Sequence, residues 1–109
     1  PSILNRNDAS GQRGIWSSNN VYGKWETYFN KGLYNIKAKF NDVQLNKNSK
    51  FILELNQQVY SKSVLNFDKE DFIELKNIRV DEGKYSLIPF LRNGNKNLLP
   101  FYLEIEKIN

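Results

Sequence analysis

Hydrophobic and polar residues alternate along much of this chain. The clearest run spans residues 34–40, where Tyr34, Ile36, Ala38 and Phe40 alternate with polar residues. A period of two places one set of side chains on the buried face of a β-strand and the other set in solvent. Since no window keeps the helical spacing of apolar residues over three turns, the pattern predicts an all-β protein.

One strand–turn–strand pattern occurs twice. Residues 29–36 (FNKGLYNI) are echoed by residues 80–87 (VDEGKYSL). In each copy a polar pair and a glycine lead into a second strand that opens with Tyr34 or Tyr85. Glycine supplies the positive φ that a tight turn needs, and the tyrosine starts an inward-facing row. The repeat therefore predicts two β-hairpins.

Further alternating segments are separated by turn residues at intervals of about 8–12 residues. The predicted strands cover residues 21–29, 51–55, 59–64, 72–80, 85–91 and 99–105. Together with the repeat they predict an antiparallel β-sandwich of about seven to eight strands, of the jelly-roll, galactose-binding-like or immunoglobulin-like type. A closed β-barrel remains the alternative architecture, because strand patterning alone does not separate the two.

Two strands contain an irregularity. In residues 72–80, Ile73 and Leu75 share one parity while Ile78 and Val80 share the other. A β-bulge near residues 76–77 would bring both pairs to the same face. The proline at position 89 cannot donate a ladder hydrogen bond, so it predicts an edge position or a bulge in the strand 85–91.

The chain has 109 residues, enough for one domain. Residues 1–14 are expected to form an irregular lead-in, and residues 15–109 a single β-sandwich domain. No apolar run approaches the roughly 18 residues of a membrane span. The chain lacks an initiator methionine, so we expect a fragment or a processed chain.

Composition excludes several kinds of chemistry. Cysteine, histidine and methionine are absent, which removes thiol chemistry, disulfides, the commonest zinc ligands and the usual proton shuttle near neutral pH. The net charge is +4, and the lysines are dispersed rather than clustered. Dispersed lysines are typical of a solvated face, whereas a nucleic-acid-binding domain would need a basic stripe on one surface. Nucleic acid is therefore not the expected partner.

Carboxylates come in two adjacent pairs, Glu70-Asp71 and Asp81-Glu82. Both pairs lie in predicted turns, where water keeps the carboxyl groups ionised and unfit for general acid catalysis. We predict no catalytic residue, no metal ligand and no cofactor, with a structural calcium ion in a turn as the alternative.

Aromatic residues are the remaining functional candidates, because apolar sugar faces stack on exposed rings while neighbouring polar side chains bond the hydroxyls. Tyr34 and Tyr85 each begin an inward row, so a core position is predicted for both, and also for Trp25. Trp16 lies beside polar residues, where exposure and burial are equally expected. The candidate residues for carbohydrate or domain contact are Trp16, Tyr22, Tyr60, Arg92 and Asn93.

The order of motifs resembles a known group of domains. Residues 23–29 (GKWETYF), 32–36 (GLYNI), 71–75 (DFIEL), 83–87 (GKYSL) and 99–105 (LPFYLEI) carry the likeness. They are similar to the carbohydrate-binding-module-like β-sandwich at the C-terminus of many Bacteroidetes-type sulfatases. A similar layout recurs in family 6 and family 35 carbohydrate-binding modules.

The resemblance implies a non-catalytic accessory domain of a secreted or periplasmic polysaccharide-degrading enzyme, with a sulfatase as the expected host. The chain lacks the Cys-x-Pro-x-Arg or Ser-x-Pro-x-Arg segment of sulfatase catalysis, so the chemistry would belong to a covalently linked domain. The implied role is to bind carbohydrate, including sulfated glycan, or to brace the catalytic domain. A stand-alone protein-interaction or adhesion sandwich and a basic nucleic-acid-binding β-domain are the alternatives.

Overall fold

The computed structural model describes residues 2–5, 10–13, 22–41, 43–68 and 70–109. Within these ranges the chain is built from strands and contains no helix, so none could cross a membrane. The strands are β1 (Ser2–Asn5), β2 (Ser10–Arg13), β3 (Tyr22–Phe29), β4 (Gly32–Lys39), β5 (Lys50–Leu55), β6 (Gln58–Ser63), β7 (Phe72–Val80), β8 (Gly83–Asn93), β9 (Lys96–Leu98) and β10 (Tyr102–Lys107). The predicted all-β class is confirmed.

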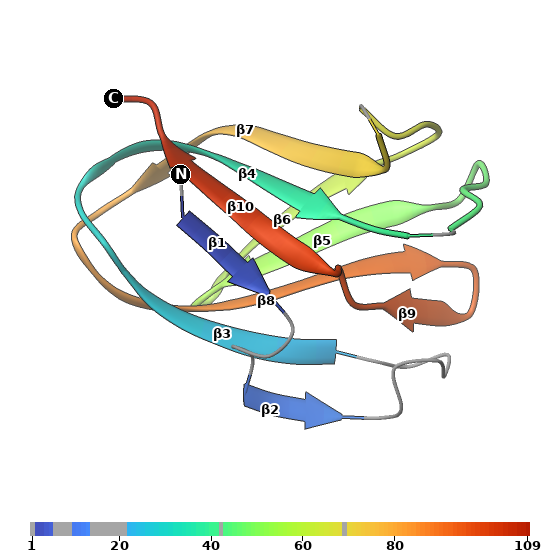
Figure 1. Ribbon diagram of the computed structural model, residues 1–109, viewed down its shortest axis with the longest axis horizontal. Helices are drawn as coiled ribbons and strands as arrows, with labels where there is room; N and C mark the ends of the chain where they lie inside the picture. The colour runs from blue at the N-terminus through green and yellow to red at the C-terminus, as the bar shows by residue number, and fades with distance from the viewer. Residues whose placement is uncertain (1, 6–9, 14–21, 42, 69) are drawn as a thin grey trace.

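The strands form two antiparallel sheets that pack as a sandwich (Figure 1). The order of one sheet is β1-β10-β4-β7, and that of the other is β2-β3-β8-β5-β6, with β9 pairing beside β8. Inward-facing side chains from both sheets fill the space between them, among them Trp25, Ile36, Phe51 and Leu103. The predicted core positions of Trp25 and Tyr34 are confirmed, since their side chains are 1% and 6% exposed.

Strand partners are nested along the chain. β1 pairs with β10, β3 with β8, β4 with β7, and β5 with β6, so that each pair encloses the next. Successive pairs alternate between the two sheets. This nested order is a jelly roll, one of the sandwich topologies expected from the sequence.

The repeated segments form corners between the sheets rather than hairpins, which corrects the prediction. β3 and β4 lie in different sheets, and so do β7 and β8. A polar pair followed by glycine reverses the chain in either case. In a hairpin the next strand pairs with the one before it, whereas at a corner it joins the other sheet. This choice depends on pairing with distant strands, so the local sequence pattern is the same in both cases. The predicted strands 51–55 and 59–64, by contrast, are joined by a short turn and do form a hairpin, β5–β6.

The two corners pair with each other in a symmetric way. Phe29 lies opposite Gly83, and Gly32 lies opposite Val80. Phe29 and Val80 are equivalent in the repeat, as are the two glycines, so each corner makes the same pairs with the other. The repeat is thus an approximate two-fold relation between adjacent corners of the sandwich.

The two corner glycines serve different needs. Gly83 has a φ of 154°, which side-chain-bearing residues rarely adopt. Gly32 has no positive φ, so the expectation is wrong at this position. A Cβ atom at Gly32 would lie 2.5 Å from the carbonyl oxygen of Asn109, which shows that this glycine is required for space.

The corner tyrosines make the same hydrogen bond in both copies. The Tyr34 hydroxyl donates to the carbonyl oxygen of Asn30 at 2.6 Å, and the Tyr85 hydroxyl donates to that of Asp81 at 3.0 Å. The Phe29 ring packs edge-on against both, with centroid distances of 4.9 Å to Tyr34 and 5.4 Å to Tyr85. Tyr85 is only partly buried, whereas Tyr34 is buried as predicted.

The bulge predicted in β7 is present. Ile36 pairs with Leu75 and Tyr34 pairs with Ile78, so β7 has one extra residue between these two pairs. Asn77 lies within this extra stretch and has a φ of 59°. Both hydrophobic pairs of the strand are consequently buried on the same face.

Pro89 lies in β8, which is a central strand and not an edge strand. One side of the strand nevertheless lacks a paired neighbour at this position, as a residue without an N–H group requires. On one side Pro89 pairs with Leu53 of β5. On the other side, the pairing of β3 with β8 ends at Leu87 and that of β9 begins at Leu91. The missing N–H group therefore meets an interruption in the ladder instead of an edge.

Two expectations near the chain ends differ from the structure. Residues 1–14 were expected to be irregular, but they contain β1 and β2, which pair with β10 and β3. The alternation of residues 99–105 places Phe101 on the same side as Leu99, Leu103 and Ile105, and so predicts a buried position for it. Phe101 is 48% exposed because the chain leaves the strand geometry between β9 and β10.

Candidate functional site

A hollow lies where the β5–β6 turn meets the β7–β8 corner. It has a volume of about 950 Å³ and is lined by this turn, the end of β7, the first part of β8 and Lys24 of β3. Three segments that are distant in sequence build it, and polar side chains contribute much of its wall. Concave surfaces that combine an aromatic side chain with a few polar groups are typical of small-molecule sites.

Tyr60 supplies an aromatic ring to this hollow. It lies on β6 opposite Leu53, packs against the core and remains partly exposed. Its hydroxyl donates to Oε1 of Gln58 at 3.1 Å, which orients both side chains at the rim. Of the five candidate residues from the sequence, the structure places Tyr60 in the hollow.

The amide-rich turn of residues 56–58 forms one wall. Asn56 has a φ of 55°, and its Oδ1 atom accepts a hydrogen bond from the backbone N–H of Ser86 at 2.8 Å. Asn56 is therefore committed to anchoring the turn on β8. Gln57 and Gln58 are exposed beside it and present amide groups, which can both donate and accept hydrogen bonds.

Charged groups of both signs line the opposite wall. Arg79 and Asp81 flank the last residue of β7, and both are exposed. A guanidinium group offers five donors in a planar fork, and a carboxylate offers only acceptors. The hollow can thus donate hydrogen bonds to hydroxyl or anionic oxygens and accept hydrogen bonds from hydroxyl groups. Sequence reasoning missed Arg79 and Gln57, because no local pattern shows that the β7 end and the β5–β6 turn meet.

Arg92 and Asn93 lie outside the lining of this hollow, at the end of β8 before the β8–β9 turn. The Arg92 Nε atom donates to Oδ1 of Asn97 at 3.0 Å. Asn93 joins the loop before β5 to this turn, because its Oδ1 accepts from the hydroxyl of Ser49 and its Nδ2 donates to the carbonyl oxygen of Gln44. The structure therefore gives Asn93 an internal anchoring role.

The other two candidate residues from the sequence are less fully described. Trp16 lies outside the described residues. Tyr22 is the first residue of β3, and its backbone pairs with Arg13 of β2.

The two adjacent carboxylate pairs remain apart from one another. Glu70 and Asp71 lie in the turn before β7, whereas Asp81 and Glu82 form the β7–β8 corner. Among the described residues, no three acidic side chains gather closely enough to hold a metal ion.

Tyr28 and Glu82 link the two corners on the surface. The Tyr28 hydroxyl donates to Oε2 of Glu82 at 2.6 Å. This hydrogen bond, reinforced by desolvation and by repulsion from the carboxylate, raises the pKa of Tyr28 above its usual value of 10.0. The nearby Glu26 carboxylate lies 3.7 Å from the ammonium groups of both Lys24 and Lys84.

A second aromatic surface lies on the outer face of the other sheet. The rings of Phe72 and Tyr102 meet edge to face at 5.9 Å, and the Lys39 ammonium lies 4.9 Å from the centre of the Phe72 ring. Lys39 also donates to the carbonyl oxygen of Glu70. Its charge is therefore engaged with groups of the protein itself.

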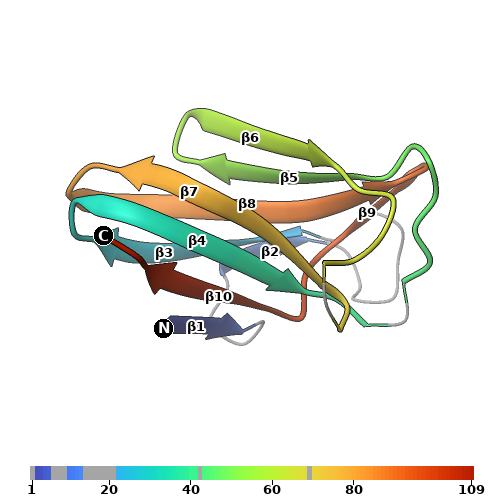
Figure 2. The same cartoon turned by 90° about the horizontal axis from the view of Figure 1, so that it is seen from above.

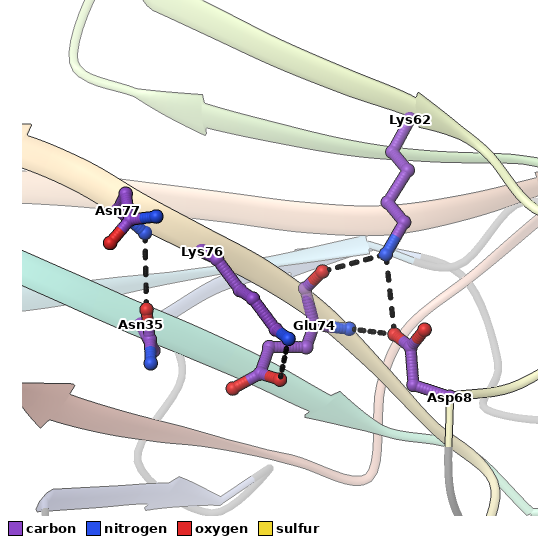
Figure 3. Close-up of polar contacts among 6 residues, drawn as sticks. All are labelled: Asn35, Lys62, Asp68, Glu74, Lys76 and Asn77. Carbon is purple, nitrogen blue, oxygen red and sulfur yellow. Dashed lines mark hydrogen bonds and ion pairs between the residues drawn. The ribbon is translucent and has the colours of Figure 1, made fainter.

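A polar clasp, defined here as Lys62, Asp68 and Glu74, joins the edges of the two sheets (Figure 3). The Glu74 backbone N–H donates to Oδ2 of Asp68 at 2.6 Å. The Lys62 ammonium donates to the Glu74 carbonyl oxygen at 2.9 Å and lies 3.3 Å from Asp68 Oδ2. Both backbone groups of Glu74 that face away from β4 are thereby satisfied by side chains.

Comparisons of the chain with protein families, with curated proteins and with solved structures found no match.

Proposed function

We propose that this chain is a carbohydrate-binding module whose site is the hollow around Tyr60. The observation that carries the proposal is the juxtaposition in one concavity of a partly exposed phenol ring, two exposed glutamines, a guanidinium and a carboxylate. A ring face can pack on the apolar C–H face of a sugar, while amide and charged groups bond its hydroxyls.

The sequence resemblance supports a role beside a catalytic domain. In this proposal the module belongs to a secreted or periplasmic polysaccharide-degrading enzyme, with a sulfatase as the host. It either holds the glycan near the active site or braces the catalytic domain. Arg79 favours an anionic group such as a sulfate ester, because its planar fork of donors matches tetrahedral oxyanions well.

Calorimetric titration with neutral and sulfated oligosaccharides tests the proposal. We expect binding to at least one glycan and a loss of at least tenfold in affinity in Tyr60→Ala, because the stacking surface is removed. Phe101→Ala is the matched control, since it removes an exposed ring outside the hollow and should leave the affinity unchanged.

Arg79→Gln separates the ligand classes. It should weaken sulfated ligands more than neutral ones, because the glutamine keeps hydrogen-bonding capacity and loses the charge. An absence of binding heat with every glycan, or equal effects of Tyr60→Ala and Phe101→Ala, would overturn the assignment.

A further inference from the structure

Strand β6 forms a regular outer edge of its sheet (Figure 2). It pairs with β5 over its whole length, from Gln58 opposite Leu55 to Ser63 opposite Lys50, without a shift of register. In the described part of the chain, no strand pairs with its other side. Gln58 and Tyr60 of this strand also line the hollow proposed above as the carbohydrate site. The inference uses the outward backbone groups of β6 and does not depend on that proposal.

Hydrogen bonds at the two ends of the hairpin show which backbone groups of β6 face outward. The Asn56 N–H donates to Ser86 of β8, and the Val64 N–H donates to the carbonyl oxygen of Ser49. Because the direction of these groups alternates along a strand, Gln58, Tyr60 and Lys62 bond to β5. The N–H and C=O groups of Val59, Ser61 and Ser63 consequently face away from the sheet.

The other edges of the two sheets are less suited to accept a strand. On β7 the clasp occupies both outward backbone groups of Glu74 (Figure 3), and the bulge at Asn77 interrupts the strand. β1 and β2 have four residues each. Short strands, bulges and covered backbone groups are common protections of sheet edges against pairing. β6 has none of these protections.

The side chains along the outward edge are uncharged. Val59, Ser61 and Ser63 are exposed and share the outer face of the sheet. The one charged side chain of β6, Lys62, points toward β7 and is held there by Asp68 and Glu74. We propose that β6 pairs antiparallel with β6 of a second copy of this chain, which joins the two sheets across a two-fold axis.

The sequence of β6 selects the register of this pairing. With Ser61 opposite Ser61 of the second copy, Val59 lies opposite Ser63 in both directions, which gives three hydrogen-bonded residue pairs. Tyr60 then lies opposite Lys62. Moving the two-fold axis by one residue, to Lys62 or to Tyr60, would leave only two hydrogen-bonded pairs. With the axis at Lys62, the two Lys62 side chains would also lie directly opposite each other. Like charges directly opposite each other destabilise a sheet.

We assign the partner strand to a second copy of this chain, because β6 is complementary to itself in this register. A single strand pair buries much less than the roughly 1,200–2,000 Å² of a stable interface. The dimer is therefore weak and forms only at high protein concentration, so the test compares low and high concentrations.

Amide hydrogen exchange at low and high protein concentration tests the pairing directly. The amides of Val59, Ser61 and Ser63 should be protected only at high concentration, because they face solvent in the monomer. The amides of Tyr60 and Lys62, which bond to β5, should be protected at both. Sedimentation of the same samples should shift from monomer to dimer.

Two substitutions at the centre of the edge make the test specific. Ser61→Lys opposes two charges on the axis, and Ser61→Pro removes an N–H that β5 does not use. Both should weaken dimerisation at least tenfold while the circular dichroism spectrum is kept. Gln57→Lys is the matched control, since it adds the same charge in the turn beyond β6 and should dimerise as the unmodified chain does.

Three results would overturn the proposal. The first is a monomer at every concentration with rapid exchange at Val59, Ser61 and Ser63. The second is a dimer that Ser61→Lys and Gln57→Lys affect equally. The third is protection of these amides that appears only when an extended peptide of another sequence is added, which would assign the edge to a different partner.

Discussion

Tyr34 and Tyr85 show how one residue type serves the same purpose in two environments. Each hydroxyl donates to the carbonyl oxygen four residues earlier and so holds its corner closed. The Tyr34 bond is shorter and lies in a more buried setting. A carbonyl that loses its partner inside the protein cannot regain it from water as easily as one at the surface.

The first prediction concerns these hydroxyls. Tyr34→Phe should lower the free energy of unfolding by about 1–2 kcal/mol, and Tyr85→Phe by about 0.5–1 kcal/mol, because the Asn30 carbonyl is less accessible to water than that of Asp81. Urea denaturation of the two single variants measures the difference. An equal loss in both, or a larger loss in Tyr85→Phe, would contradict this assignment of burial.

At this scale the sequence predicted the buried residues well where alternation is regular. Trp25, Tyr34 and the inward row of β4 are buried because their parity is fixed by a continuous ladder. Phe101 was misplaced because the ladder stops before it, so its parity no longer determines its side. The anchoring role of Asn93 depends on contacts with the loop of residues 44–49, which local sequence does not reveal.

Among the elements, the bulge of β7 was predictable and the corners were not. A change of hydrophobic parity within one strand leaves few alternatives to an extra residue. Asn77 is well suited to that residue, since asparagine tolerates a positive φ and its N–H donates to Oδ1 of Asn35 at 3.0 Å. A hairpin and a corner, in contrast, differ in the partner of the next strand, which is distant in sequence.

The second prediction tests the bulge. Asn77→Val should destabilise the protein by about 1–2 kcal/mol, because a β-branched residue is strained at a φ of 59°. Asn77→Gly should cost less, since glycine adopts this φ freely. Lys76→Val is the control, because it places the same side chain on the neighbouring exposed residue. Thermal or urea unfolding measures all three, and similar losses in Lys76→Val and Asn77→Val would refute the strain argument.

For the whole molecule, the nested order of strands determines how the chain must assemble. The innermost pair, β5 with β6, is local, while β3 with β8 and β1 with β10 join segments from opposite parts of the chain. The hollow around Tyr60 depends on the same long-range order, because β6, the end of β7 and the start of β8 meet only in the folded protein. Of the described residues that line the candidate site, sequence reasoning therefore named Tyr60 alone.

The third prediction follows from this order. Contacts between distant segments must be formed against the entropy of closing long loops, so refolding should take on the order of milliseconds to seconds, as in other sandwiches. Stopped-flow fluorescence of the buried Trp25, in a Trp16→Phe variant that leaves it as the one tryptophan, can follow the reaction. Relaxation within microseconds would show that local contacts dominate and would contradict the nested order as the limiting feature.

The antiparallel pairing of β1 with β10 also determines how the domain responds to tension. Ser2 lies opposite Ile105, so the outer ends of the two strands leave the fold at the same end of their shared ladder. A force that pulls these two strand ends apart would act perpendicular to the strands and would break the hydrogen bonds of the ladder one after another. Force applied to these two strand ends should therefore open the β1–β10 ladder gradually, whereas strands loaded along their length would resist until all their bonds broke together.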